Sequence, residues 1–206
     1  MIKSYILVTG AFMKLRLSSY LFGMFLLIAY LPMAEAHTFG AHGMGLTAGF
    51  AHPFFGIDHV LAMIAVGMWA SQLGGKSIVI APLAFVIVMA GSAYLGALGV
   101  ALPELEPAIA CSVLVLGLLI AFAVRVSTLT SVCLVGLFAV FHGLAHGLEL
   151  PQTATPMLYA VGFVSATVML HGAGIAMGIS ARHVSYLFRL GGSLIALTGL
   201  FLLATT

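Results

Sequence analysis

Three candidate metal ligands occur within eight positions of one apolar stretch. The segment His52-Pro-Phe-Phe-Gly-Ile-Asp58-His59 places a carboxylate among imidazoles, with no basic residue nearby in sequence. An acid inside a membrane segment is costly unless it is paired, so it is a functional residue by default. Imidazole and carboxylate together suit borderline divalent metals such as nickel, cobalt and zinc. The pattern favours a metal site over the alternative, an Asp–His hydrogen bond that only fixes a helix break.

A second group of candidate ligands lies in Phe141-His-Gly-x-Ala-His-Gly-x-Glu149. His142 and His146 are four residues apart and Glu149 follows three later, so helical geometry places all three on one face. Two imidazoles with this spacing chelate zinc in H-E-x-x-H helices, although the catalytic Glu of that motif is absent here. The alternative is a pair of core histidines bonded to carbonyls, but the three-residue stripe favours metal binding.

Two further sets of histidines are less informative. His37 and His42 would lie at an exported N-terminus, where they predict a capture site for a cation, with a plain polar tail as the equal alternative. His171 stands alone in an apolar segment, which is typical of a hydrogen-bonded packing residue rather than a ligand, with a place on the ion pathway as the minor alternative.

These residues are embedded in a chain suited to a bilayer. Of its 206 residues 63% are hydrophobic and 6% charged, whereas soluble domains carry about 25% charged residues. Apolar runs of about 20 residues recur, and that length spans a bilayer as a helix. The net charge of +2 is too small to indicate nucleic-acid binding. The loop around Lys76 loosely resembles a phosphate-binding loop, but it joins two membrane helices, so we expect no use of ATP.

The beginning of the chain has the features of a cleaved signal peptide over residues 1–36. A basic segment starts at Met13, the expected translation start, and an apolar stretch follows to about Leu31. Pro32 and the Ala34-Glu35-Ala36 cleavage pattern end it. An uncleaved first membrane helix is the alternative. With the signal peptide cleaved after Ala36, the mature chain, residues 37–206, is predicted to be one transmembrane domain.

The apolar periodicity predicts an all-α, polytopic membrane protein, and a break near His52–Gly56 because Pro53 cannot continue a helix. The six predicted helices are Met44–Gln72, Ile78–Val100, Ala108–Arg125, Thr128–Leu148, Pro156–Ile179 and Val184–Leu203.

The charges sort onto alternate loops. Lys76, Arg125 and Arg182 follow the odd-numbered helices, whereas Glu104 and Glu149 follow the even-numbered ones. The positive-inside rule places the basic loops in the cytoplasm. We therefore expect a protein of the bacterial cytoplasmic (inner) membrane, with both mature termini in the periplasm.

The two motifs resemble the signatures of the HupE/UreJ family, small six-helix membrane proteins with cleaved signals that are associated with nickel supply to hydrogenase or urease, and in some cases with cobalt. The first motif is also similar to the His-x4-Asp-His motif of larger nickel/cobalt permeases, with one extra residue here. The metal-contacting residues that the resemblance implies are His52, Asp58, His59, His142, His146 and Glu149.

The function predicted from these features is uptake of a divalent metal ion, nickel or cobalt, as a transported substrate, with no organic cofactor and no enzymatic activity. The opposite directions of the first and fourth helices suggest a 3+3 inverted repeat. The sequence does not determine the oligomeric state and is compatible with a homo-oligomer. The alternatives are a membrane-embedded zinc-dependent hydrolase, which would use similar ligands, and a haem-binding cytochrome.

Overall fold

The computed structural model describes residues 44–181 and 185–206, which belong to one compact unit. All regular structure in this part of the chain is helical, which confirms the predicted all-α class. The predicted signal peptide, residues 1–36, and the candidate ligands His37 and His42 lie outside the described residues.

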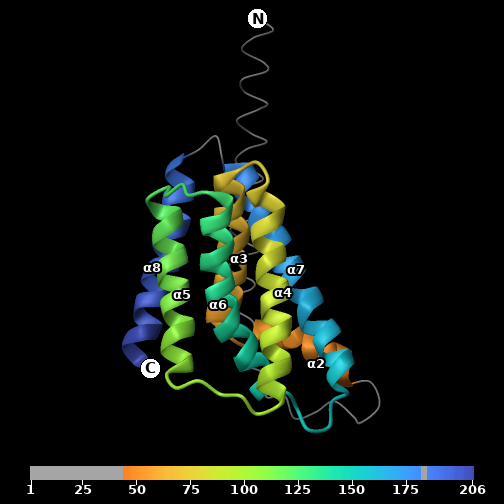
Figure 1. Ribbon diagram of the computed structural model, residues 1–206. Helices are drawn as coiled ribbons and strands as arrows, with labels where there is room; N and C mark the ends of the chain where they lie inside the picture. The colour runs from red at the N-terminus through yellow and green to blue at the C-terminus, as the bar shows by residue number, and fades with distance from the viewer. Residues whose placement is uncertain (1–43, 182–184) are drawn as a thin grey trace, which may run out of the picture. The chain divides into compact units, whose positions relative to one another are not determined.

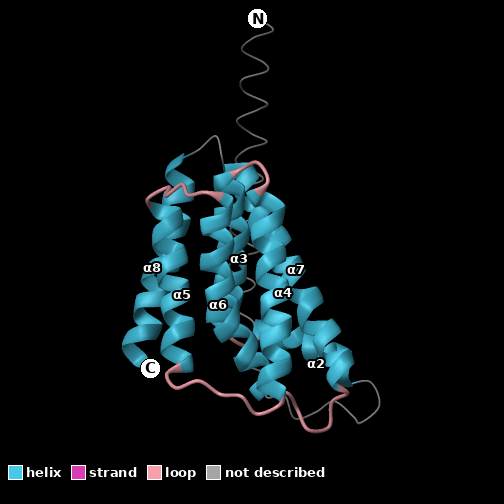
Figure 2. Cartoon of the chain, viewed as in Figure 1, coloured by secondary structure: helices cyan, strands magenta, loops and turns pink. Residues whose placement is uncertain are grey.

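Each predicted helix has a counterpart, and the predicted ends differ from the observed ones by at most four residues. The described elements are shown in Figures 1 and 2 and are, in chain order, α2 (Met44–Ala51), the 3-10 helix η1 (His52–Phe54), α3 (Ile57–Leu73), α4 (Ser77–Ala97), α5 (Leu105–Ala121), α6 (Thr128–Leu148), α7 (Pro156–Ala181) and α8 (Ser185–Thr205).

Four of the described helices, α4, α6, α7 and α8, are long and apolar enough to cross a bilayer. The pair formed by α2 and α3 passes the same test as one span, bent by 81°. Helix α5 has 17 residues, at the short end of the roughly 17–25 residues that span a bilayer. The described helices thus support four or five crossings by length and composition, and the sixth stays a prediction.

The predicted break between the first two helical segments is confirmed. Helix α2 ends at Ala51, Pro53 lies in the single turn of η1, and Gly56 adopts an extended conformation (φ −105°, ψ 115°) before α3 begins. Proline lacks the backbone N–H that a continuing helix needs. The break places Asp58 in the first turn of α3, where the positive end of the helix dipole favours a carboxylate.

Helix α3 is the central helix of the bundle. Every residue from His59 to Ala70 is buried, and α3 contacts α4, α5, α7 and α8. A helix that is buried on all sides has no lipid face. The side chains from His59 onward therefore lie in the protein interior.

The other helices pack in close pairs, with α4 against α6 and α5 against α8. A Cβ added to Gly143 or Gly147 of α6 would collide with the backbone carbonyl of Met89 or Ala93 in α4. Small residues of this kind allow close helix packing in membranes. Gly143 and Gly147 thus bring α6 against α4.

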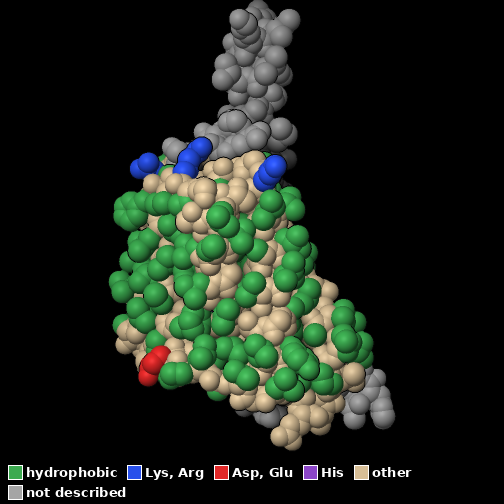
Figure 3. Space-filling model, viewed as in Figure 1, with side chains coloured by type: hydrophobic (Ala, Val, Ile, Leu, Met, Phe, Trp, Pro, Cys, Tyr) green, Lys and Arg blue, Asp and Glu red, His purple; other side chains and the backbone are tan. Residues whose placement is uncertain are grey.

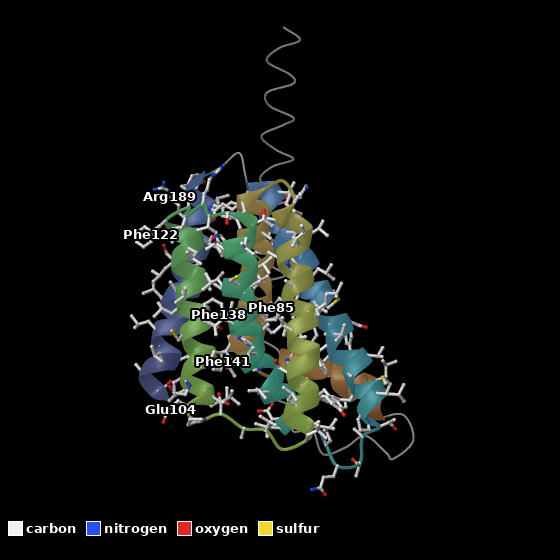
Figure 4. The ribbon with its side chains drawn as sticks, viewed as in Figure 1. Phe85, Glu104, Phe122, Phe138, Phe141 and Arg189 are labelled. Carbon is white, nitrogen blue, oxygen red and sulfur yellow. The ribbon has the colours of Figure 1, made fainter. Side chains whose placement is uncertain are left out.

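The outer surface of the bundle is largely apolar. Phe122, Leu129 and Met157 are 72%, 73% and 72% exposed, and apolar side chains cover most of the face in Figure 3. Basic side chains gather at one end of this face and an acidic side chain lies at the other, with Arg189 and Glu104 labelled at opposite ends in Figure 4. The surface is that of a protein surrounded by lipid, and its charges sort by end as predicted.

Candidate metal-ion site

Four predicted ligands bring their imidazole rings together at the broken helix. The ring centroid of His59 lies 4.8 Å from that of His142 and 4.7 Å from that of His146. The His52 and His146 centroids are 4.9 Å apart. The break between α2 and α3 supplies two of the rings and the last two turns of α6 supply the others. We call His52, His59, His142 and His146 the histidine cluster.

Asp58 orients one member of this cluster. Its Oδ1 accepts a hydrogen bond from the ring Nδ1–H of His59 at 2.8 Å and another from the His59 backbone N–H at 2.7 Å. Because Nδ1 carries the hydrogen, Nε2 of the neutral ring keeps its lone pair. That Nε2 is buried and has no hydrogen-bond partner in the described part of the chain. Metal-binding histidines typically donate their other N–H to a carboxylate in this way.

Ser112 of α5 fixes His142 in the same manner. The Ser112 hydroxyl donates to the carbonyl of Ile109 at 2.7 Å, so its oxygen is left to accept from Nε2–H of His142 at 2.9 Å. The lone pair of His142 then lies on Nδ1, which is buried and unpartnered among the described residues. The sequence offered no signal for Ser112, because a serine in an apolar helix is unremarkable without knowledge of what packs against it.

His146 differs from these two residues in its surroundings. Both ring nitrogens are buried without a hydrogen-bond partner within the described ranges, and the ring stacks on Phe163 of α7 at 5.0 Å. An unpaired polar group in the interior costs about 1–3 kcal/mol. A residue needed only to fill space here would be better apolar, so the imidazole requires a functional explanation.

The outermost contact of the site joins its two sequence motifs. Nε2 of His52 donates to Oε2 of Glu149 at 2.9 Å, and Glu149 lies just beyond the last turn of α6. This hydrogen bond holds the pKa of Glu149 below its ordinary value. Glu149 therefore stays ionised near neutral pH and adds negative charge at the mouth of the site.

The predicted ligands are gathered but do not form a closed coordination shell. Among residues 44–181 and 185–206, no group of three His, Cys, Asp or Glu side chains is arranged to hold one metal ion. An ion needs nitrogen ligands at about 2.0–2.1 Å, so rotation of these side chains would have to close the site. Glu149 contacts His52 rather than its own helical neighbours. The ligand role of each residue stays a prediction.

Two other titratable residues lie near or beyond the cluster. The carboxylate of Glu106, at the start of α5, interacts electrostatically with those of Asp58 and Glu149. His171 of α7 donates from Nδ1 to the carbonyl of Met63 at 2.8 Å, which confirms that it is a hydrogen-bonded interior residue.

Apolar helices packed around buried imidazoles and a carboxylate define a polytopic α-helical membrane protein with a polar site inside its bundle. The chain belongs to the HupE / UreJ family, since the family described as HupE / UreJ protein matches residues 24–202. Protein HupE of Rhizobium leguminosarum bv. viciae is 48% identical over 178 residues, which cover 85% of this chain and 93% of that relative. No solved structure matches the chain. The resemblance seen in the two motifs is confirmed.

Proposed function

We propose that the protein takes up a divalent transition metal, nickel in the first place and cobalt as the alternative, across the cytoplasmic membrane for hydrogenase or urease maturation. One observation carries the proposal. His59 and His142 each have one ring nitrogen fixed by a hydrogen-bond acceptor, while the other, lone-pair nitrogen is buried and unpartnered in the described part of the chain. This is the usual arrangement of imidazoles that bind metal.

Burial of the candidate ligands increases along the site. The side chain of Glu149 is 50% exposed and that of His52 22%, that of His59 is 10% exposed, and His142 is fully buried. A cation would first meet a carboxylate and then exchange its water for imidazole nitrogens in turn. Conduction requires binding that is favourable at entry and weak enough for release. The gradation supports a transport pathway rather than a single catalytic centre, and we infer no enzymatic activity and no use of ATP.

The helix pairing supports a two-fold relation between a first half, α2–α5, and a second half, α6–α8. In this relation α3, α4 and α5 correspond to α6, α7 and α8. The contacting pair α3–α7 then corresponds to the contacting pair α6–α4, and the pair α5–α8 corresponds to itself. Transporters built from inverted repeats place their sites near the repeat interface, at broken helices. We propose that the site lies between two such halves, with the acidic end of the bundle in the periplasm and the basic end in the cytoplasm.

Replacement of His146 tests this function. His146 makes no hydrogen bond that the structure records, so His146→Leu should fold as well as the native protein. Nickel uptake should nevertheless fall, because leucine has no lone pair to bind an ion. His146→Gln serves as a polar companion variant. Uptake of radioactive nickel by cells at limiting concentration is compared at equal membrane expression.

Excess external nickel should partly restore uptake in these variants if affinity alone has decreased. Native uptake by both His146→Leu and His142→Gln would show that the imidazoles of α6 are structural. The proposed function would then have lost its main support.

A further inference from the structure

The buried His171 of α7 is only half explained by packing. Its Nδ1–H donates to the Met63 carbonyl, which can only accept, so the lone pair of the neutral ring lies on Nε2. That nitrogen is buried and without a partner among the residues the structure describes, and His171 is 2% exposed. A structural histidine needs only the first nitrogen. The second resembles the lone-pair nitrogens of His59 and His142.

His171 lies on the inward continuation of the histidine cluster. Phe163, which stacks on His146, shares one face of α7 with Thr167 and His171, because these residues are four apart. All three are buried. His171 follows Phe163 by eight positions, so it lies about 12 Å farther along α7 than Phe163. On α3, the Met63 carbonyl that orients His171 likewise lies one turn beyond His59.

Phe85 of α4 lies between the histidine cluster and His171. Its ring centroid is 5.8 Å from that of His142 and 5.2 Å from that of His171, and it is fully buried. In Figure 4 it lies about midway between the ends marked by Glu104 and Arg189. An aromatic ring attracts a desolvated cation to its face. Phe85 thus contacts both imidazoles and is the side chain that lies between them.

We propose that His171 is an inner ligand for the transported divalent ion at mid-membrane, reached from the histidine cluster past Phe85. The inference rests on the proposed function and extends it from a site to a path. A single imidazole leaves the rest of the coordination shell to water, so binding at this level is weak and transient. Such a contact suits an ion that must move on toward the basic end.

The variant His171→Asn separates the two ring nitrogens. The amide nitrogen of asparagine is as many bonds from Cβ as Nδ1 of histidine, so it can still donate to the Met63 carbonyl. The Nε2 lone pair is lost. Nickel uptake by cells should fall at least about tenfold, the size of effect seen when ligand arrangements are disturbed. Nickel affinity of the purified full-length protein should change by no more than about twofold, because the four imidazoles of the histidine cluster are unchanged.

Asp58→Asn is measured in parallel because it acts on the outer site alone. If it lowers both affinity and uptake while His171→Asn transports as the native protein does, the inner ligand is refuted and the proposed function stands. If neither Asp58→Asn nor His142→Gln lowers uptake, the proposed function itself fails. Should His171→Asn not accumulate in the membrane, His171→Gln decides by the same criteria, since its amide fills the ring volume without a basic nitrogen.

Discussion

Replacement of Asp58 by asparagine tests how the carboxylate acts on its neighbour. One oxygen, Oδ1, accepts both the ring and the backbone N–H of His59, at 2.8 and 2.7 Å. Asparagine keeps a carbonyl oxygen that can accept these bonds, so the fold of the first turn of α3 should survive. What is lost is the negative charge that holds the proton on Nδ1 and raises the basicity of Nε2.

The size of the effect follows from the bonds that change. A hydrogen bond to a charged group contributes about 1.5–3 kcal/mol and a neutral one about 0.5–1.5 kcal/mol. In Asp58→Asn the hydrogen bond from the His59 ring N–H goes to a neutral oxygen instead of a charged one. This change removes about 1–1.5 kcal/mol, which corresponds to a nearly tenfold change in metal affinity. Measured losses for such supporting carboxylates are about 10–100-fold in metal affinity. We expect Asp58→Asn to lower nickel affinity within this range.

Nickel binding to purified protein and nickel uptake by cells measure this effect. Glu104→Gln is the matched control, because it removes an exposed carboxylate at the acidic end of the bundle, outside the histidine cluster. It should change uptake little. Native affinity and uptake in Asp58→Asn, at equal expression and limiting nickel, would refute the role that the structure gives to Asp58.

Three further predictions concern other parts of the bundle. Ser112→Ala should lower nickel affinity about 2–10-fold, the value of one hydrogen bond, as binding to purified protein measures; native affinity would show that His142 needs no orienting group. Gly147→Val should destabilise the protein by about 1–3 kcal/mol or more through overpacking against α4, visible as a lower melting temperature in detergent. Single cysteines at Lys76 and Glu104, in a background without the two native cysteines, should react with an impermeant reagent from outside only at Glu104; the reverse pattern would overturn the orientation.

The helices and the broken segment could be predicted because they depend on local sequence. Long apolar runs fix the spans, and Pro53 and Gly56 fix the break. The motif spacing also identified the four rings of the histidine cluster, since polar residues in apolar segments are conspicuous.

What could not be predicted depends on contacts between distant segments. The partner of His142 is a serine 30 residues away, and the partner of His171 is a backbone carbonyl 108 residues away. Neither has a distinctive sequence pattern. The contact of Gly143 and Gly147 with α4 was likewise missed, because a glycine does not reveal which helix approaches it.

The break before α3 also determines where an ion would experience the electric field. The histidine cluster lies at the start of α3, whose 17 residues end at Leu73, so about 21 Å of this helix continues beyond His59 toward the basic end. With the orientation proposed above, most of the transmembrane voltage falls across the part of the bundle beyond the cluster. The membrane voltage contributes about 2.3 kcal/mol per charge per 100 mV. Loading of the cluster should therefore depend little on voltage, whereas the passage from the cluster to the cytoplasm should accelerate as the interior becomes more negative.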